Sequence, residues 1–412
     1  MRYSDSVNSS STGMVVLGMN TLAFTVCFAS WVINGVLVTF LVKNGIYPWD
    51  QVQIGWLVAI PVLTGSLARL PIGVLTDHHG GRAVFTSLLL VSAVAMFFLS
   101  RVDSFAGFIL AGLLFGISGA SFAVGIAYTS VWFPKEKQGT ALGIFGAGNI
   151  GAALTGIGAP SLLAYLTNNG AHLEGWRNLP RLYAAALLLT AMVFFVFTHP
   201  KKIQREKSIR ERLLPLKNIR VWRFGLYYFC LFGGFVGFAQ WLIPYYVNNY
   251  RFSLQTAGWL AAAFSLSAGL IRPLGGFISD KCGARSVMYG IFSGTFLIAL
   301  LLTIPSLDTV FFTFLVFLLG LLLGVGMAAV YKHIPAYFPD EVGVVGGLVS
   351  VIGGLGGFFL PLIFGLLLKT TGLWGSCWIF FALLIALDLA WMHGVIRRIN
   401  HQMVPGTEGS HG

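Results

Sequence analysis

The sequence predicts an all-α membrane protein whose twelve transmembrane helices form two repeated halves of six. Hydrophobic residues make up 56% of the 412-residue chain and charged residues only 10%, with a mean hydropathy of +0.81. Water-soluble domains carry about 25% charged residues, so a soluble globule is excluded. The prediction rests on this composition, on a series of long apolar runs, and on a repeat that relates the two halves.

Twelve apolar runs near 20 residues or longer follow one another, and each can cross a bilayer as a helix. The first run is too long for a signal peptide and lacks a small-residue cleavage pattern, so it is expected to remain as a helix. The expected helices lie at about 14–41, 52–76, 83–100, 105–132, 139–166, 181–199, 222–248, 254–279, 285–304, 309–335, 342–368 and 373–396.

The repeat is clearest around two arginines, Arg69 and Arg272, which interrupt apolar runs and lie 203 positions apart. The surrounding segments, 67–77 and 270–280, read LARLPIGVLTD and LIRPLGGFISD. A guanidinium at membrane depth costs roughly 2.5–3.5 kcal/mol on insertion scales. A chain that meets this cost twice, at equivalent places, is expected to use the charges, most simply to hold an anion.

A second echo supports two homologous halves, because FPKE at 133–136 returns as FPDE at 338–341. The stretch 200–221 is the only long polar segment in the middle of the chain. Two parallel six-helix repeats with a site between them are a transporter architecture. The predicted units are a first bundle (14–199), a cytoplasmic linker (200–221), a second bundle (222–398) and a short cytoplasmic tail (399–412).

The net charge of +12 follows membrane topology rather than nucleic-acid binding. With both termini in the cytoplasm, seventeen of the 26 lysines and arginines lie on the cytoplasmic side and six on the opposite side. This asymmetry obeys the positive-inside rule and predicts a bacterial inner-membrane protein with cytoplasmic termini. Only Arg69, Arg272 and Lys332 remain within or near the spans.

Glycines concentrate in the two repeat-related helices at 139–166 and 342–368. In lipid, glycine lets helices approach closely, so these helices are expected to form sliding contacts or to lie close to a small ligand. Static helix packing is the alternative interpretation. The glycines expected to serve conformational change are Gly143, Gly148, Gly151, Gly353, Gly354 and Gly356.

These motifs together resemble the major facilitator superfamily. The pattern Gly73-x-x-x-Asp77-x-x-Gly80-x-Arg82 is similar to its loop signature, and it returns with Asp280, Gly283 and Arg285. The glycine-rich stretches 143–151 and 346–357 resemble the two nitrate-signature helices of the nitrate/nitrite porter family. The pattern around Tyr228 and Phe232 in 222–248 is also similar to that family.

The resemblance implies that Arg69 and Arg272 clamp a planar anion. It further implies that Asn149 and Tyr228 contact the anion and that Phe122 and Phe232 flank it. Guanidinium suits nitrate, because its planar fork gives two parallel hydrogen bonds and is always charged.

From the residues alone, alternatives stay open for each member of this site. The arginines could snorkel to headgroups, Asn149 could bond a neighbouring helix, and Tyr228 and the two phenylalanines could be core packing. Asp77 and Asp280 are expected to control conformation by pairing with Arg82 or Arg285, or with a helix N-terminus.

Proton coupling has few candidates. Of the fourteen acidic residues, only Asp388 falls well inside an apolar run. It belongs to the last helix, which is expected to be peripheral. Lys332 resembles a lysine of the proton-linked branch of the family, although a snorkelling lysine fits equally well. His333 and His393 lie near cytoplasmic helix ends and do not resemble a central proton carrier. His78 departs from the superfamily loop, which commonly has Arg or Lys there.

No metal site, cofactor or enzyme motif is expected, since the four cysteines are scattered and no nucleotide-binding or nucleophile motif occurs. The sequence predicts a monomeric secondary transporter in the lipid bilayer, moving nitrate or nitrite with a proton by alternating access. A nitrate/nitrite antiporter and a transporter of small carboxylates are the rivals. An anion sensor without transport is a rival of another class, but it would need a signalling domain.

Overall fold

The computed structural model describes residues 2–201, 209–305, 307–338 and 342–402, and within these ranges the chain is helical without a β-strand. The first half contains α1 (Arg2–Trp31), α2 (Asn34–Lys43), α3 (Gln51–His79), α4 (Gly81–Leu99), α5 (Phe105–Phe115), η1 (Gly116–Ala120), α6 (Ser121–Ser130), α7 (Lys135–Gly146), η2 (Ala147–Ile150), α8 (Gly151–Leu166), η3 (Leu173–Arg177) and α9 (Asn178–Phe197). The second half contains α10 (Ile209–Leu213), η4 (Leu214–Lys217), α11 (Ile219–Tyr228), η5 (Phe229–Gly233), α12 (Gly234–Asn248), α13 (Leu254–Leu270), α14 (Arg272–Cys282), α15 (Ala284–Leu301), α16 (Thr309–Tyr337), α17 (Val342–Thr371) and α18 (Ser376–Gln402).

Parts of three sequence predictions lie outside the described residues. These parts are residues 202–208 of the linker, residues 339–341 of the second FPDE echo, and residues 403–412 of the tail.

The prediction of an all-α membrane fold is confirmed. The described residues contain eleven helices long and apolar enough to span a membrane, or twelve when α13 and α14 count as one bent span. Each of the twelve predicted runs coincides with one of these spans. The first helix begins at Arg2 rather than near residue 14, and a turn at 32–33 separates it from α2.

The predicted continuous helix at 254–279 is wrong in one respect. The chain bends by 42° between α13 and α14, at Ile271. Pro273 in the first turn of α14 accounts for the break, because proline has no N–H to donate and its ring clashes with the preceding turn. As a result, Arg272 becomes the first residue of a new helix.

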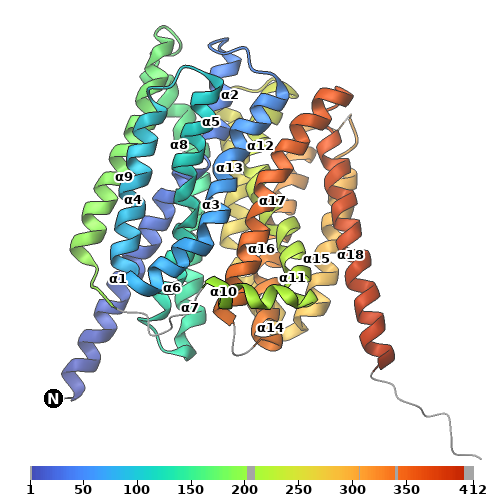
Figure 1. Ribbon diagram of the computed structural model, residues 1–412. Coiled ribbons are helices and arrows are strands. Elements are labelled where there is room, and N and C mark those ends of the chain that lie inside the picture. The colour runs from blue at the N-terminus through green and yellow to red at the C-terminus, as the bar shows by residue number, and fades with distance from the viewer. Residues whose placement is uncertain (1, 202–208, 306, 339–341, 403–412) are drawn as a thin grey trace, which may run out of the picture.

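The helices of the first half, blue to green in Figure 1, stand beside those of the second half, yellow to red. The end where α1 begins and α18 ends is called the terminal end below, and the other the loop end. The short helix α10 lies across the terminal end, in contact with both α3 and α17 (Figure 1). The linker therefore contains a helix that touches both halves.

Close contacts between the halves run from the middle of the bundle to the loop end. A Cβ on Gly156 of α8 would lie 3.0 Å from the Gly258 carbonyl oxygen of α13, and one on Gly55 of α3 would lie 2.9 Å from the Pro361 carbonyl oxygen of α17. At the loop end itself, Lys369 Nζ pairs with Asp50 Oδ2 at 2.9 Å. The bundle is therefore closed at the loop end.

Glycines nearer the terminal end have no such neighbours. A Cβ on Gly143 or Gly146 of α7, on Gly276 of α14, or on Gly347 of α17 would meet no atom within 4 Å beyond its own helix turns and chain neighbours. Among the described residues, these positions of α7, α14 and α17 therefore lack the close contacts that α3, α8, α13 and α17 make toward the loop end.

Candidate functional site

Arg69 lies in the middle of α3 with only 3% of its surface exposed. Its Nη1 donates a 2.6 Å hydrogen bond to the Ser350 carbonyl oxygen of α17, in the other half of the chain. Its Nε donates a longer bond of 3.4 Å to the Gly119 carbonyl oxygen. A snorkelling arginine would carry its guanidinium toward the helix end, whereas this group is held among carbonyls at the centre.

Three aromatic rings surround the Arg69 guanidinium. Its central carbon lies 5.4 Å from the Phe122 ring centroid, 5.3 Å from that of Phe232 and 5.8 Å from that of Trp31. Phe122 belongs to the first half and Phe232 to the second, so two of the predicted aromatic residues meet at Arg69. Trp31 was not predicted, because a tryptophan in an apolar run reads as core.

Arg272 begins α14, and its Nη2 donates to the Tyr228 hydroxyl at 3.2 Å. The Tyr228 ring stacks on Phe232 at 5.1 Å with an interplanar angle of 2°. Because Phe232 also faces Arg69, one aromatic pair connects the two guanidinium groups. The structure thus brings Arg69, Arg272, Tyr228 and Phe232 into one cluster.

One buried donor of the cluster, Nη1 of Arg272, has no hydrogen-bond partner among the described residues. Both side-chain amide atoms of Asn149, which is 1% exposed, also lack one. Leaving a buried donor unpaired costs about 1–3 kcal/mol, and more for a charged group. An anion held at the cluster would accept a hydrogen bond from Arg272 Nη1, so this unpaired donor points to a ligand.

Asn149 lies in η2, directly after Gly148. A Cβ on the preceding Gly148 would overlap the ring of Phe24, which packs 5.6 Å from Phe122. The hydrogen bond to a neighbouring helix that was the alternative interpretation of Asn149 is absent among the described residues.

Tyr331 is a further member that sequence reasoning missed. Its ring meets Tyr228 edge-on at 5.0 Å, and its hydroxyl donates to the Gly346 carbonyl oxygen at 3.1 Å. Its phenol lies within electrostatic reach of both Arg69 and Arg272. A tyrosine near the end of an apolar run carries no sequence signal for such a position.

The glycines of α17 are required by close packing around this cluster. A Cβ on Gly353 would overlap the Tyr228 ring, one on Gly354 would overlap the Ser66 hydroxyl, and one on Gly356 would overlap the Phe229 carbonyl oxygen. In the first half, a Cβ on Gly151 would overlap the Thr25 carbonyl oxygen. Gly143 differs, since its Cβ position is open, and the expected close contact is not observed there in this conformation.

The charged loops at the terminal end pair differently from the expectation. Asp280 forms an ion pair with Lys332, not with Arg285, whose Nη2 donates to the Tyr337 hydroxyl at 2.7 Å. Lys332 belongs to α16 next to α14, so its amine reaches the carboxylate at the end of α14. This ion pair corrects the expected Asp280–Arg285 pairing.

The equivalent arginine of the first half, Arg82, binds a backbone carbonyl instead of a side chain. Arg82 donates from Nε and Nη2 to the Phe195 carbonyl oxygen at 3.1 and 2.6 Å. Asp77, near the end of α3, has a partner of its own.

Asp388 is buried, with 6% of its surface exposed, and faces the second half of the bundle. The Cys230 thiol in η5 lies next to it, while its Oδ2 has no partner among the described residues. The last helix is peripheral, as expected, since α18 is the least buried of the eleven spans among the described residues, but the Asp388 side chain lies on its buried side. Among the described residues, no group of three or more His, Cys, Asp or Glu is placed to hold a metal.

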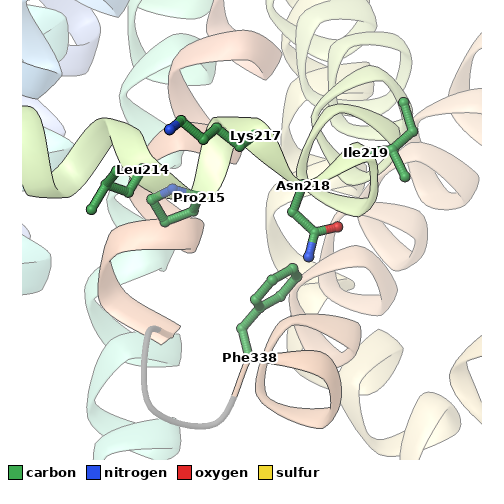
Figure 2. A pocket seen from close by; sticks show the side chains of 6 residues that line it. All are labelled: Leu214, Pro215, Lys217, Asn218, Ile219 and Phe338. Carbon is green, nitrogen blue, oxygen red and sulfur yellow. The ribbon is translucent and has the colours of Figure 1, made fainter.

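An open cleft of about 580 Å³ lies away from the arginines, where the linker crosses the terminal end. Figure 2 shows the Phe338 ring pointing toward Asn218, below the linker segment with Leu214, Pro215 and Lys217. This cleft reflects the crossing of the linker over the helix ends, and it has none of the buried charge found around Arg69.

Comparison with known proteins places the chain in a family. The profile of the Major Facilitator Superfamily matches residues 19–254 and 226–407. The "Probable nitrate/nitrite antiporter NarK1" of Thermus thermophilus is 42% identical, covering 94% of this chain and 92% of its own. The "Probable nitrate transporter NarT" of Staphylococcus carnosus is 34% identical, covering 93% of this chain and 96% of its own.

A solved structure agrees on the fold alone, at 16% identity. It is the bacterial homologue of the human lysosomal transporter Spinster, in an inward-facing and unoccupied conformation. It superimposes with a TM-score of 0.74 over 92% of this chain and 96% of that one. The chain is a member of the Major Facilitator Superfamily and, within it, of the NarK-like nitrate/nitrite porters.

Proposed function

We propose that this chain is a secondary transporter, not an enzyme, that moves nitrate and the related anion nitrite by alternating access around Arg69 and Arg272. The observation that carries the proposal is the pair of guanidinium groups, one from each half, joined through Phe232 and Tyr228. The names of the NarK and NarT relatives support the substrate.

Nitrate suits this cluster for three physical reasons. It is planar, so it fits between aromatic rings such as those of Phe122 and Phe232. It has three oxygens, which accept hydrogen bonds from several donors at once, including the unpaired Nη1 of Arg272. Its single charge lies between two fixed cations in a medium of low dielectric, where attraction at 4 Å is worth about 4 kcal/mol at an effective dielectric constant of 20.

The anion would also be the link between the halves. Without it, two like charges repel across the boundary. With it, each half donates to the same ligand, so binding favours closure around the anion. Arg69, Arg272, Tyr228, Asn149, Phe122 and Phe232 are the proposed substrate-binding residues.

We assign the terminal end to the cytoplasm of a bacterial inner membrane, with both chain ends inside, because most lysines and arginines lie on that side. The close contacts at the loop end then correspond to a state closed to the outside and directed to the cytoplasm. The Asp280–Lys332 ion pair and the arginines Arg82 and Arg285 are proposed to stabilise this state. The transporter acts as a monomer, coupled to a proton.

The test is uptake of labelled nitrate by the purified protein in liposomes, with pH and membrane potential set independently. Nitrate should enter vesicles that contain neither nitrate nor nitrite when an inward proton gradient is imposed. Protein-free liposomes and the Arg101→Lys variant, altered at an exposed arginine away from the cluster, are the controls. If formate or acetate inhibited nitrate uptake as strongly as nitrite does, the substrate would be a small carboxylate and not nitrate.

Nitrate/nitrite exchange is the second candidate function, and one observation favours it. One anion between two fixed cations leaves a net charge of about +1, and the empty carrier has more, so its return is opposed by an inside-negative potential. A counter-anion on the return step removes this cost, and the Thermus thermophilus relative is named an antiporter. Uptake that requires internal nitrite and ignores the proton gradient would establish exchange.

A further inference from the structure

A seam of buried polar groups runs between α11, α15 and α18, outside the anion site. Asp388 of α18 lies deepest, and the Cys230 thiol lies next to it. Tyr227 is 3% exposed, and within the described part of the chain neither its hydroxyl nor Oδ2 of Asp388 has a hydrogen-bond partner. Burying two polar groups without hydrogen bonds costs free energy, unless a water bonds to them or protonation neutralises the carboxylate.

The seam continues toward the terminal end. The Tyr227 hydroxyl has Asp388, Arg223 and Tyr289 as its electrostatic neighbours. The Tyr289 hydroxyl in turn hydrogen-bonds with Nδ1 of His393 at 3.1 Å. His393 is exposed and lies one and a half turns of α18 from the end of its span at Arg398.

An open cleft of about 420 Å³ lies between α15 and α18 beside these groups. Tyr289, Ser293 and His393 contribute its polar lining. The titratable group that faces Asp388 from η5 is Cys230, and the one from α11 is Tyr227, with Arg223 of the same helix beyond Tyr227. From α15, the titratable group is Tyr289. His393 lies on the same helix.

The seam reaches the anion site through η5, a single π-helical turn at Phe229–Gly233. Cys230 in this turn faces Asp388, while Tyr228 and Phe232 face the arginines. A Cβ on Gly233 would meet the Gly353 carbonyl oxygen of α17 at 2.9 Å, so the turn is packed on both sides. Single π-turns inside α-helices occur frequently at functional sites.

We propose that Asp388 is the proton-binding site of this transporter, reached from the terminal end through His393, Tyr289 and Tyr227, and linked to the anion site through the π-helical turn. The inference rests on the proposed proton-coupled nitrate transport and identifies where the coupling proton binds. The proton binds a carboxylate oxygen of Asp388 in the state directed to the loop end, where nitrate enters. In the state directed to the terminal end, it leaves that oxygen for solvent through this seam.

The charges explain why a proton is needed. Loaded with nitrate and with Asp388 protonated, the charges of Arg69, Arg272, nitrate and Asp388 sum to +1. Empty and with Asp388 ionised, they also sum to +1. Protonation therefore gives the loaded and the empty carrier the same charge, so the electrical work of the inward step and that of the return cancel over the cycle. One nitrate and one proton then cross together without net charge.

The test uses the full chain in liposomes and the variant Asp388→Asn, which mimics the protonated carboxyl. This variant should lose accumulation driven by a proton gradient, and lose the external alkalinisation that accompanies nitrate entry. It should keep nitrate/nitrate counterflow, which needs only the loaded carrier. Asp308→Asn, at an exposed helix cap, is the matched carboxylate control and should behave as the wild type.

Tyr227→Phe tests the path in the same way. It removes the hydroxyl and keeps the ring, so proton-driven uptake should slow while counterflow stays. Tyr246→Phe is the matched control, since Tyr246 is equally buried but its hydroxyl donates to Thr313 at 3.2 Å, away from the seam. Wild-type uptake driven by the proton gradient should be insensitive to an imposed potential.

Other results would overturn the inference. If Asp388→Asn accumulates nitrate on a proton gradient as well as the wild type, Asp388 is not the proton-binding site. If the folded variant loses counterflow as much as accumulation, the role of Asp388 is structural. Nitrate uptake by the wild type without proton movement removes proton coupling but leaves nitrate transport standing. If the wild type moves no nitrate, the proposed function fails. Infrared difference spectra then still decide the site, because a carboxyl band that titrates in the wild type must be absent in Asp388→Asn.

Discussion

Replacing Arg69 by lysine tests whether the geometry of the guanidinium matters beyond its charge. The structure assigns two of its donors to carbonyl oxygens, those of Ser350 and Gly119, which leaves the rest of the fork for a ligand. Lysine keeps the charge but offers one ammonium, whose donors would have to serve these carbonyls or the anion. At least one charge-assisted hydrogen bond is lost, worth about 1.5–3 kcal/mol. This corresponds to a roughly ten- to hundredfold weaker affinity for nitrate.

The assay is isothermal titration of nitrate into purified protein, combined with uptake into liposomes. Arg272→Lys should weaken binding in the same range, because it loses the Tyr228 hydrogen bond or the anion contact. Arg101→Lys, at an exposed arginine that lies over Phe97, controls for the substitution itself and should leave affinity unchanged. Near-normal affinity and uptake in either Arg69→Lys or Arg272→Lys, at normal expression, would refute the role of guanidinium geometry. The positive charge alone would then explain nitrate binding.

Three further predictions concern the moving parts. Gly353→Val and Gly148→Val should abolish transport while the protein still inserts, because even a Cβ would overlap the rings of Tyr228 and Phe24. Gly143→Ala is the control, because the Cβ position of Gly143 is open. Normal uptake by the valine variants would show that these glycines are not needed for transport. The hydrogen bond from Lys369, together with the backbone N–H groups of the helix cap, lowers the pKa of Asp50. The Lys369–Asp50 pair therefore stabilises the closed loop end fully above the ordinary pKa of aspartate, about 3.9, and this stabilisation is lost as the pH falls through the lowered pKa. Lys369→Ala should therefore widen the separation of spin labels at positions 44 and 249 relative to labels across the terminal end, and no change would assign the pair no role in closure. Asp280→Lys should slow transport by breaking the ion pair with Lys332, and the double exchange with Lys332→Asp should restore it, whereas independent losses would show that the pair is not coupled.

Much of the fold could be predicted from sequence, because a span in lipid needs a long apolar run and little else. The bend before Arg272 was missed, although Pro273 stands beside it in the repeat and signals a break. In the first half the proline, Pro71, stands one position later in the repeat and lies inside a continuous α3, so a proline near the arginine does not by itself predict a break.

The site was predictable only where side-chain chemistry is unusual for a membrane. Two arginines in apolar runs stand out by their cost, and the structure brings them together through Phe232 and Tyr228. The bond from Arg69 to the Ser350 carbonyl could not be predicted, because every residue has a carbonyl and only the packing of α3 on α17 selects one. Trp31 and Tyr331 were missed for a related reason: large aromatic residues in apolar runs are ordinary core until a cation lies beside them.

The two arginines, though equivalent in the repeat, are held differently, and this difference bears on how the carrier moves. Arg69 lies within the continuous helix α3, and the carbonyls of Gly119 and Ser350 hold its guanidinium. Arg272 opens α14 after a 42° bend, so the positive end of that helix dipole adds to its charge at the bundle centre. Broken helices whose N-termini face an anion are a recurrent device of transporters. Because α14 meets α13 only through the bend at Ile271, the terminal half of this span can tilt while α13 stays packed on α8 at the loop end. Arg272 would then follow the terminal end as it opens and closes, and Arg69 would hold the anion in place.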